Sequence, residues 1–352
     1  MTFQSEIVKW YLNNKRDLPW RRTTDPYVIW LSEIILQQTR VEQGLPYFIK
    51  FHERYPTVKD FAAASETDIL KLWQGLGYYS RGRNMLFTAR EVVDKHAGVF
   101  PAEYEKLLQL KGVGEYTAAA ISSLSVNEAR AVVDGNVFRV LSRYFGISTA
   151  INSSAGKKEF TGLAQRLLEN QQPSVYNQAI MEFGALHCKP KLPLCDSCPV
   201  QNGCFAFKNN MAGTLPVKEK KINKRIRHFN YFLCEDQHTG RILARRRVAG
   251  DIWQELYDLP LIETTDSFTN DPGQFTAAVQ ASFGAGCILR PLTQKKHLLT
   301  HQTIYVQFFA LNNYIINFNQ KANIKWVSMV EFEALPQPKV IADFIKWHQV
   351  KK

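Results

Sequence analysis

The chain contains 352 residues, of which 45% are hydrophobic and 12% aromatic, and it carries a formal net charge of +12. A chain of this length is expected to form two domains, and its aromatic content excludes a disordered basic tail. No apolar run approaches the roughly 18 residues that span a bilayer, and neither end shows a lipidation motif or a signal peptide. The composition therefore predicts a cytoplasmic protein that binds nucleic acid and not a membrane.

Residues 2 to about 215 show helical periodicity with short polar breaks, which predicts an all-α domain. The strongest candidate helix covers 27–43, where Val28, Leu31 and Ile35 lie three and four residues apart. Further helices are expected over 67–73, 83–96, 104–110, 116–124, 137–145, 157–170 and 175–187.

Glu33 lies in the middle of this apolar 27–43 segment. A carboxylate between apolar flanks would have a raised pKa and could donate a proton near neutrality. The sequence supports equally well a solvated polar stripe, because Gln37 and Arg40 follow four and seven residues later.

Two glycine-containing segments are candidate DNA contacts. In residues 73–83, glycines allow close backbone approach, arginines reach phosphates, and Tyr78 could wedge into a base stack. In residues 110–118, Gly112 and Gly114 flank Val113, which permits a tight hairpin whose amides bind a phosphate at the start of the next helix. The alternatives are an ordinary core hairpin and an ordinary helix–helix turn.

Asp134 follows an apolar run and precedes the helix expected near Val137. It could simply cap that helix. Alternatively, it could provide a fixed negative charge facing a cation that forms during a reaction. Cleavage of a bond between a sugar and a heteroatom needs an acid for the leaving group and a carboxylate for the oxocarbenium-like centre. Glu33 and Asp134 would suit these two roles, but the sequence does not show that they face each other.

Four of the six cysteines, Cys188, Cys195, Cys198 and Cys204, lie within 17 residues (204 − 188 + 1) in the pattern C-x6-C-x2-C-x5-C. Four thiolates so close together can surround a zinc ion or an iron–sulfur cluster, whereas disulfides would need an oxidising compartment. Spacing alone leaves zinc and iron–sulfur open. Structural zinc sites usually contain two close pairs, and here only one exists, which favours a cubane cluster.

Residues 216–227 contain six basic residues and one acidic residue and are expected to form a solvated linker. After His228, alternating apolar residues predict strands at 229–233, 242–244, 304–308 and 326–327, and 340–349 is expected to be a helix. A second, α+β domain of about 120 residues follows from this pattern. Cys234 and Cys287 are expected to be buried small side chains within it.

The hairpin at 110–118, Asp134 and the cysteine pattern together resemble the endonuclease III superfamily of base-excision DNA glycosylases. The segments around Glu33, Tyr78 and Asp134 narrow the resemblance to adenine DNA glycosylases of the MutY type. This resemblance implies a mainly α helix-hairpin-helix protein: a six-helix barrel at about 24–130, and an iron–sulfur cluster domain from the N-terminal segment and about 131–215. It further implies a basic linker at 216–227. After the linker, residues 228–352 would form an α+β Nudix-like domain that recognises 8-oxoguanine.

The resemblance also implies the substrate and the roles of the residues. The substrate would be double-stranded DNA with adenine opposite 8-oxoguanine or guanine, and the adenine would be flipped out and excised. Glu33 would protonate the adenine, Asp134 would stabilise the oxocarbenium ion, and Tyr116 would assist. The expected cofactor is a [4Fe–4S] cluster on the four cysteines. The DNA contacts implied are Gln38, Thr39, Tyr78, Gly112, Val113, Gly114, Thr300 and His301, and the adenine pocket implied is Arg16, Leu18, Trp20, Arg21 and Gln178.

Tyr116 occupies the position where lyase relatives carry a Schiff-base lysine, and tyrosine cannot form an imine. We therefore expect a monofunctional enzyme that acts as a monomer, nucleoid-associated in a bacterium. The alternatives are an endonuclease III-type glycosylase/lyase on oxidised pyrimidines, and a binding protein without catalysis. A Nudix hydrolase is excluded by residues 271–286, which lack the glutamates that would hold magnesium.

Overall fold

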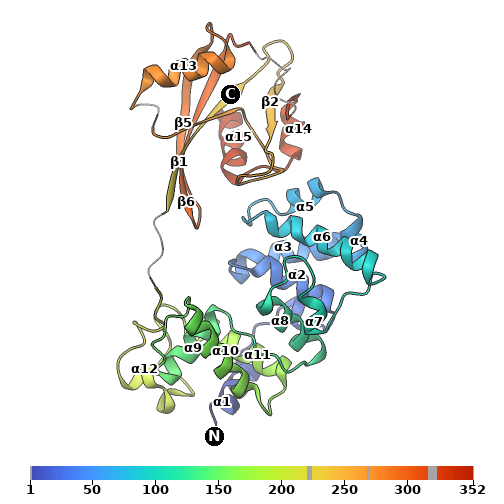
Figure 1. The fold of residues 1–352 in the computed structure, drawn as a ribbon, viewed down its shortest axis with the longest axis vertical. Helices are drawn as coiled ribbons and strands as arrows, with labels where there is room; N and C mark the ends of the chain where they lie inside the picture. The colour runs from blue at the N-terminus through green and yellow to red at the C-terminus, as the bar shows by residue number, and fades with distance from the viewer. Residues whose placement is uncertain (1, 220–223, 268–269, 316–322, 352) are drawn as a thin grey trace. The chain divides into compact units, whose positions relative to one another are not determined.

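The structure of the chain is a computed structural model, which describes residues 2–219, 224–267, 270–315 and 323–351. It divides into two compact units, one of residues 1–63 and 84–221 and the other of residues 64–83 and 222–352. The described part of the first unit is helical, whereas the second combines helices with two sheets (Figure 1). A mainly α fold followed by an α+β part is thereby confirmed, while the domain boundaries stay a prediction.

The N-terminal helix of the first unit packs against a helix that lies more than 150 residues later. Helix α1 contacts α11, and a buried core that includes Phe3, Ile7, Phe160 and Phe183 joins α1 to α9, α10 and α11. The helical elements of this unit are α1 (Phe3–Asn14), η1 (Pro19–Arg21), α2 (Pro26–Leu36), α3 (Val41–Arg54), α4 (Val58–Ala63), most of α6 (Ser80–Lys95), α7 (Tyr104–Leu107), α8 (Glu115–Val126), α9 (Gly135–Phe145), α10 (Ser154–Leu168), α11 (Pro173–Leu186), η2 (Gln201–Gly203) and α12 (Phe205–Lys208).

The helix predicted over 27–43 is wrong in its second half, because two helices occupy this region. The Asp25 carboxylate caps the start of α2 by accepting a hydrogen bond from the Tyr27 amide at 2.8 Å. The helix ends at Leu36, and Gln38 adopts a φ of 55° before α3 begins at Val41. The break could not be read from the sequence, because Gln37-Gln38-Thr39 contains neither glycine nor proline.

The hairpin predicted at 110–118 joins α7 to α8. Gly112 has a φ of 78°, and the Val113 amide donates to the Leu110 carbonyl at 3.1 Å. A Cβ atom at Gly112 would come within 3.1 Å of the Asn84 side chain, so glycine serves both the turn and the close approach of α6. Gly114 then occupies the position before α8.

The second unit contains a four-stranded sheet of order β4-β1-β6-β5 and a three-stranded sheet of order β3-β2-β7 among its described residues. Helix α15 packs on one face of the larger sheet, where the Phe344 and Phe308 rings stack at 3.9 Å, and α13 packs on the other face against Phe232 and Phe309. The elements are α5 (Glu66–Leu72), β1 (Arg225–Cys234), β2 (Ile242–Arg246), β3 (Tyr257–Asp258), β4 (Leu261–Thr264), α13 (Pro272–Phe283), β5 (Ile288–Leu298), β6 (Gln302–Asn312), β7 (Ile324–Val327), α14 (Met329–Ala334) and α15 (Lys339–Lys351).

Strand β1 begins at Arg225, four residues before the predicted strand at 229–233, so it includes the last three residues of the predicted linker. The Arg227 side chain is only 4% exposed and forms ion pairs with Asp251 and Glu263. Strand β5 escaped prediction because its central residues, such as Lys295 and Lys296, are polar. Cys234 is buried as predicted, and Cys287 is half-buried.

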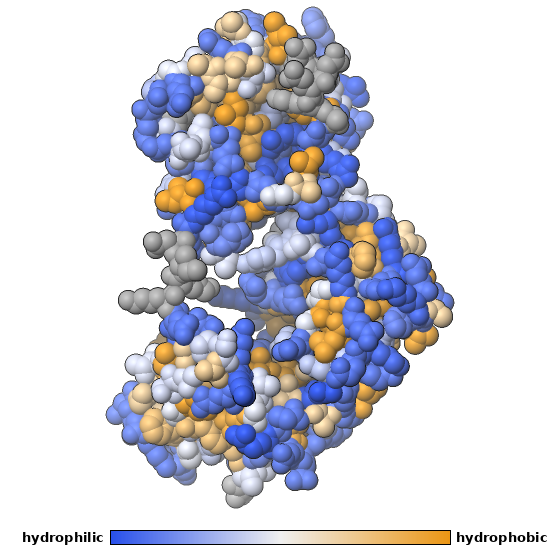
Figure 2. Space-filling model, in the orientation of Figure 1, coloured by the Kyte–Doolittle hydropathy of each residue, from blue (hydrophilic) through white to orange (hydrophobic). Residues whose placement is uncertain are grey.

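Hydrophilic side chains predominate on the face of the molecule shown in Figure 2, and apolar groups form small separate patches there. In the described residues, no helix combines the length and the apolar character needed to cross a membrane.

Candidate functional site

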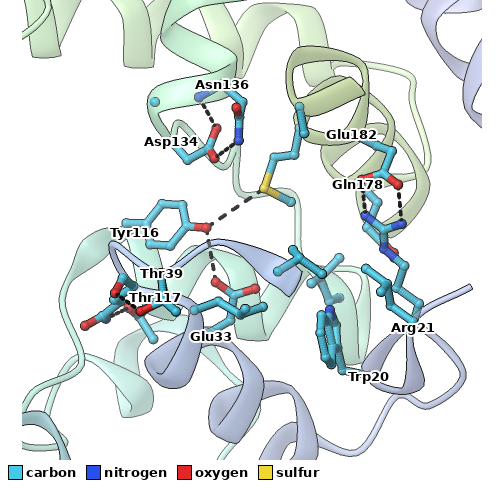
Figure 3. Close-up of a pocket in the computed structure, with 18 of the residues that line it drawn as sticks. Trp20, Arg21, Glu33, Thr39, Tyr116, Thr117, Asp134, Asn136, Gln178 and Glu182 are labelled. Atoms are coloured by element: carbon cyan, nitrogen blue, oxygen red, sulfur yellow. Dashed lines mark hydrogen bonds and ion pairs between the residues drawn. The ribbon is translucent and has the colours of Figure 1, made fainter. Parts of the chain in front are cut away.

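A cavity of about 700 Å³ in the helical unit brings together most of the residues singled out in the sequence (Figure 3). Its wall is formed by residues from η1, α2, the start of α8, the start of α9 and α11. The predicted residues that line it are Arg16, Leu18, Trp20, Arg21, Glu33, Gln38, Thr39, Gly114, Tyr116, Asp134 and Gln178.

Glu33 lies in the middle of α2, and its carboxylate faces this cavity rather than a polar stripe (Figure 3). Arg40 belongs to the residues between α2 and α3, so the stripe proposed as an alternative does not exist. Burial raises the pKa of Glu33 to about 7, with a further rise from Asp134 and opposing effects from the Tyr116 hydrogen bond and Arg21. A carboxyl group of this kind is partly protonated at neutral pH and can act as a general acid.

Tyr116 lies in the first turn of α8, with its hydroxyl between the two carboxylates (Figure 3). The hydroxyl donates to Glu33 Oε2 at 3.1 Å and lies 3.9 Å from Met181 Sδ. Burial, together with the charges of Glu33 and Asp134, raises the pKa of Tyr116 well above its ordinary value. Tyr116 therefore stays protonated at neutral pH and acts as a hydrogen-bond donor.

Asp134 caps α9, and its carboxylate also lines the cavity, so both roles considered for it are compatible. Oδ1 accepts from the Asn136 and Val137 amides at 2.9 and 2.8 Å, and Oδ2 accepts from the Asn136 side chain at 2.7 Å. Burial raises the pKa of Asp134, and these hydrogen bonds oppose the rise. Neutral donors thus orient a carboxylate that no arginine or lysine contacts directly in the hydrogen bonds described here.

Arg139, which sequence analysis missed, connects Asp134 to the cysteine-rich loop. Its buried guanidinium donates to Asn136 Oδ1 at 2.8 Å and to the Cys188 carbonyl at 2.7 Å. Asn136 in turn donates to Asp134, so two side chains, Arg139 and Asn136, connect the first cysteine of the cluster to the capping carboxylate. The signal in the sequence was too weak to find it, because an arginine four residues after a helix start is usually solvated.

Glu182 lines the cavity and was also missed by the sequence analysis. Its buried carboxylate accepts from Arg16 at 2.6 Å and from Arg21 at 2.8 Å. Burial alone would favour the neutral acid, but the hydrogen bonds from the two arginines lower the pKa of Glu182 to about 2. Glu182 is therefore a permanent anion, and it fixes both predicted pocket arginines. Gln178, also predicted, accepts from the Tyr11 hydroxyl at 3.0 Å.

The predicted DNA-contact residues fall into three places. Gln38 and Thr39 lie in the turn after α2 and line the cavity, whereas Gly112 and Val113 lie in the hairpin and do not line it. Thr88 supports this hairpin by donating to the Lys111 carbonyl at 2.6 Å.

The remaining predicted contacts lie in the second unit around a different cavity, of about 350 Å³. Tyr78, Thr300 and His301 all line it, together with Asp251 and Trp253. The Tyr78 hydroxyl forms a hydrogen bond with Thr300 Oγ1. Tyr78 has a φ of 48°, an uncommon conformation for a bulky residue that directs attention to function.

The four clustered cysteines line one small apolar cavity, which supports a shared ligand. Arg143 donates to Cys188 Sγ at 3.4 Å and to the Lys189 carbonyl at 2.8 Å, so a buried cation accompanies the thiols. Within the described ranges, no group of three or more His, Cys, Asp or Glu side chains converges closely enough to hold a single metal ion. The cavity nonetheless has the soft donor set of an iron–sulfur centre.

Comparison with known proteins agrees with this arrangement. Residues 31–169 match the HhH-GPD superfamily of base excision DNA repair proteins, and residues 230–347 match the NUDIX domain. A thermostable thymine-DNA glycosylase of known structure is 32% identical, with a TM-score of 0.55 over 59% of this chain and 95% of that chain. An endonuclease III–DNA complex shares the fold, with 23% identity and a TM-score of 0.52.

Two relatives in sequence place the chain more narrowly. The human adenine DNA glycosylase is 44% identical over 58% of this chain, although the match spans only 39% of the human protein's length. The adenine DNA glycosylase of Buchnera aphidicola subsp. Baizongia pistaciae is 30% identical over 98% of this chain and 96% of its own length. The chain therefore belongs to the adenine DNA glycosylase family.

Proposed function

We propose that this protein is a monofunctional DNA glycosylase that excises adenine opposite 8-oxoguanine or guanine in double-stranded DNA. The observation that carries the proposal is the pairing of Glu33, whose pKa is raised to about 7, with the capping carboxylate of Asp134 beside one cavity. A volume of about 700 Å³ accommodates a flipped nucleotide. The name of the relatives supports adenine as the base.

The chemistry would divide between the two carboxyl groups. Glu33, in its protonated form, gives a proton to a ring nitrogen of adenine, so that the base leaves as a neutral molecule. Asp134 stays ionised and stabilises the positive charge that develops on the deoxyribose carbon as the bond to adenine lengthens. The Tyr116 hydroxyl, which donates to Glu33 Oε2 at 3.1 Å, holds the acid in place. Water then adds to the sugar carbon and gives up a proton, which the Glu33 carboxylate can accept, and an abasic site remains.

Tyr116 favours a monofunctional reaction, because its phenol cannot form the imine through which lyases cut the backbone. The base pocket would be shaped by Leu18, Trp20 and Gln178, with Glu182 fixing Arg16 and Arg21. Glu182, Arg16 and Arg21 hydrogen-bond to one another, so we assign these three residues a positioning role and assign proton transfer to Glu33.

The cofactor we propose is a [4Fe–4S] cluster bound by Cys188, Cys195, Cys198 and Cys204. Four thiols around one apolar cavity support this assignment, because each cysteine of a cubane cluster binds a separate iron and the sulfurs need not converge on one point. Bound there, the cluster would cross-link residues 188–204. Hydrogen bonds through Arg139 and Asn136 connect this loop to Asp134, so an ordered loop would help to hold the Asp134 carboxylate in place.

DNA would contact the hairpin of Gly112, Val113 and Gly114 through backbone amides, and Gln38 and Thr39 would lie beside the extruded base. We assign recognition of 8-oxoguanine to Tyr78, Thr300 and His301, because these three line one cavity in the second unit. We expect the chain to act as a monomer in the cytoplasm, with the recognition domain starting near residue 228.

The decisive experiment uses labelled duplexes with adenine opposite 8-oxoguanine, guanine or thymine, and with thymine opposite guanine. Strands are analysed before and after hot alkali. The proposal requires cleavage after alkali only, and only for adenine opposite 8-oxoguanine or guanine. Breaks without alkali would show lyase chemistry. Processing of thymine opposite guanine would instead point to the activity named for the thymine-DNA glycosylase relative.

A further inference from the structure

The turn between β5 and β6 is held rigidly at its backbone while one of its side chains remains open to solvent. The Leu299 amide donates to the Gln302 carbonyl at 2.9 Å, and the Arg225 amide on β1 donates to the His301 carbonyl at 3.2 Å. The His301 side chain is exposed, whereas its neighbour Gln302 is buried with only 4% of its surface accessible. Because the Gln302 side chain contacts the His301 ring, its donor or acceptor atom determines how the ring is oriented and protonated.

The Gln302 side chain lies between an imidazole and a guanidinium. Its Nε2 atom is 2.8 Å from His301 Nε2, and Arg227 Nη1 donates to its Oε1 atom at 3.4 Å. Arginine has only donors, so the amide oxygen must face Arg227 and the amide NH2 must face the histidine. An NH2 group can only donate, so His301 Nε2 must carry its lone pair.

Arg227 cannot turn to release this orientation, because acidic partners hold it on two sides. Its guanidinium donates to Glu263 at 2.7 and 2.5 Å and to Asp251 at 2.6 and 2.7 Å. Hydrogen bonds to Glu263 and Asp251 raise the pKa of Arg227 above its ordinary value, so it is always a cation. The hydrogen bonds therefore run in one direction. Arg227 donates to Glu263 and Asp251 and also to the Gln302 amide oxygen, and the Gln302 amide NH2 donates to His301.

We propose that Gln302, oriented by Arg227, is a positioning residue that fixes His301 in the tautomer with its proton on Nδ1. The consequence rests on the proposed function: His301 offers its Nδ1–H to an acceptor oxygen of the bound DNA. Two oxygens fit this chemistry, O8 of 8-oxoguanine and a backbone phosphate oxygen. The exposed side chain lines the cavity that contains Tyr78 and Thr300, which puts the donor where the lesion would lie.

The tautomer can be measured in the DNA-free, full-length protein. Multiple-bond ¹H–¹⁵N NMR of histidine-labelled protein distinguishes a protonated ring nitrogen from one with a lone pair. His301→Asn identifies the signal among the eight histidines. We expect a protonated Nδ1 and a lone pair on Nε2 in the wild type. Wild-type protein with its proton on Nε2 would overturn the proposal.

Gln302→Glu should reverse the tautomer without disturbing the fold. A glutamate has the same shape, keeps a partner for Arg227, and offers His301 only acceptors. In the neutral imidazole, the proton must therefore move to Nε2. Gln302→Met removes the amide and should give a mixture of tautomers. Gln307→Glu is the matched control, because this half-buried glutamine lies on the same strand and contacts the Phe308 carbonyl instead. An unchanged tautomer in Gln302→Glu would contradict the proposal.

Affinity for DNA then tests the consequence. With duplexes that carry a non-cleavable adenine analogue, Gln302→Glu should bind the 8-oxoguanine pair about 3- to 10-fold more weakly than Gln307→Glu does. A loss confined to the 8-oxoguanine duplex assigns the contact to O8, and an equal loss with guanine assigns it to a phosphate. Equal binding by both variants would overturn the DNA contact. A wild type without preference for either duplex would refute the proposed function alone, because the tautomer is measured without DNA.

Discussion

The cavity of the helical unit and the sheet unit hold their carboxylates in opposite ways. In the cavity, Glu33 and Asp134 receive hydrogen bonds from neutral donors, and burial raises the pKa of both. In the sheet unit, Asp251 is also partly buried, but hydrogen bonds from Arg227 and the charge of Arg247 lower its pKa. A carboxyl group that must exchange a proton therefore needs partners without charge, whereas one that must hold a loop is best saturated by arginine.

Glu182 provides an internal comparison, because it shares the cavity with Glu33 yet resembles the carboxylates of the sheet unit. Its two arginine partners hold its pKa at about 2, about five units below that of Glu33. Two glutamates that line the same cavity thus have very different pKa values because their hydrogen-bond partners differ. Whether a glutamate can exchange a proton near neutral pH is therefore determined by its hydrogen-bond partners and not by its residue type.

The largest expected effect comes from Glu33→Gln, which keeps the shape and the Tyr116 contact but cannot deliver a proton. We expect the single-turnover rate of adenine release to fall by about 10³-fold or more, with DNA affinity nearly unchanged. In the wild type, the rate should fall as pH rises through about 7, because the raised pKa leaves the acid unprotonated above that value. A variant that loses binding as well would show that Glu33 is structural.

The same comparison explains how far the sequence could predict the site. Glu33, Tyr116 and Asp134 each lie in or next to a helix, so local patterns and family motifs located them. Glu182 and Arg139 escaped because their roles depend on partners more than 40 residues away, such as Arg16 and Cys188. The helical fold was largely predictable for the same reason, whereas polar strand β5 is defined by pairing with β6 and not by its own pattern.

A second prediction concerns the link between the cysteine loop and the cavity. Arg139→Leu would leave the Cys188 carbonyl and Asn136 without their donor, so Asp134 would lose its fixed orientation. We expect a loss of about 10²-fold in single-turnover rate and a lower iron content. Arg166→Leu, an exposed arginine on α10, is the control and should change neither. Full activity in Arg139→Leu would show that the cap alone positions Asp134.

The raised pKa of Glu33 also predicts a cost in stability. Its pKa in the folded state lies above the ordinary value of 4.5, so folding favours the protonated form. Stability should therefore decrease as pH rises from about 4.5 to 7, and the full cost should be present above pH 7. Glu33→Gln removes a group that resists ionisation, so it should raise Tm by about 2–4 °C at pH 8 and by little at pH 4.5. Equal shifts at both pH values would contradict the assignment.

The smallest expected effect concerns the cavity lined by Tyr78, Thr300 and His301, to which we assign recognition of 8-oxoguanine without proton transfer. Thr300→Val keeps the shape but removes the hydroxyl that meets Tyr78. We expect the ratio of kcat/KM for adenine opposite 8-oxoguanine over guanine to fall about 3-fold, since one neutral hydrogen bond contributes about 1 kcal/mol. Thr293→Val, on β5 and outside this cavity, is the control. An unchanged ratio together with unchanged Tm would exclude Thr300 from discrimination and would leave Tyr78 and His301 as the remaining candidates in this cavity.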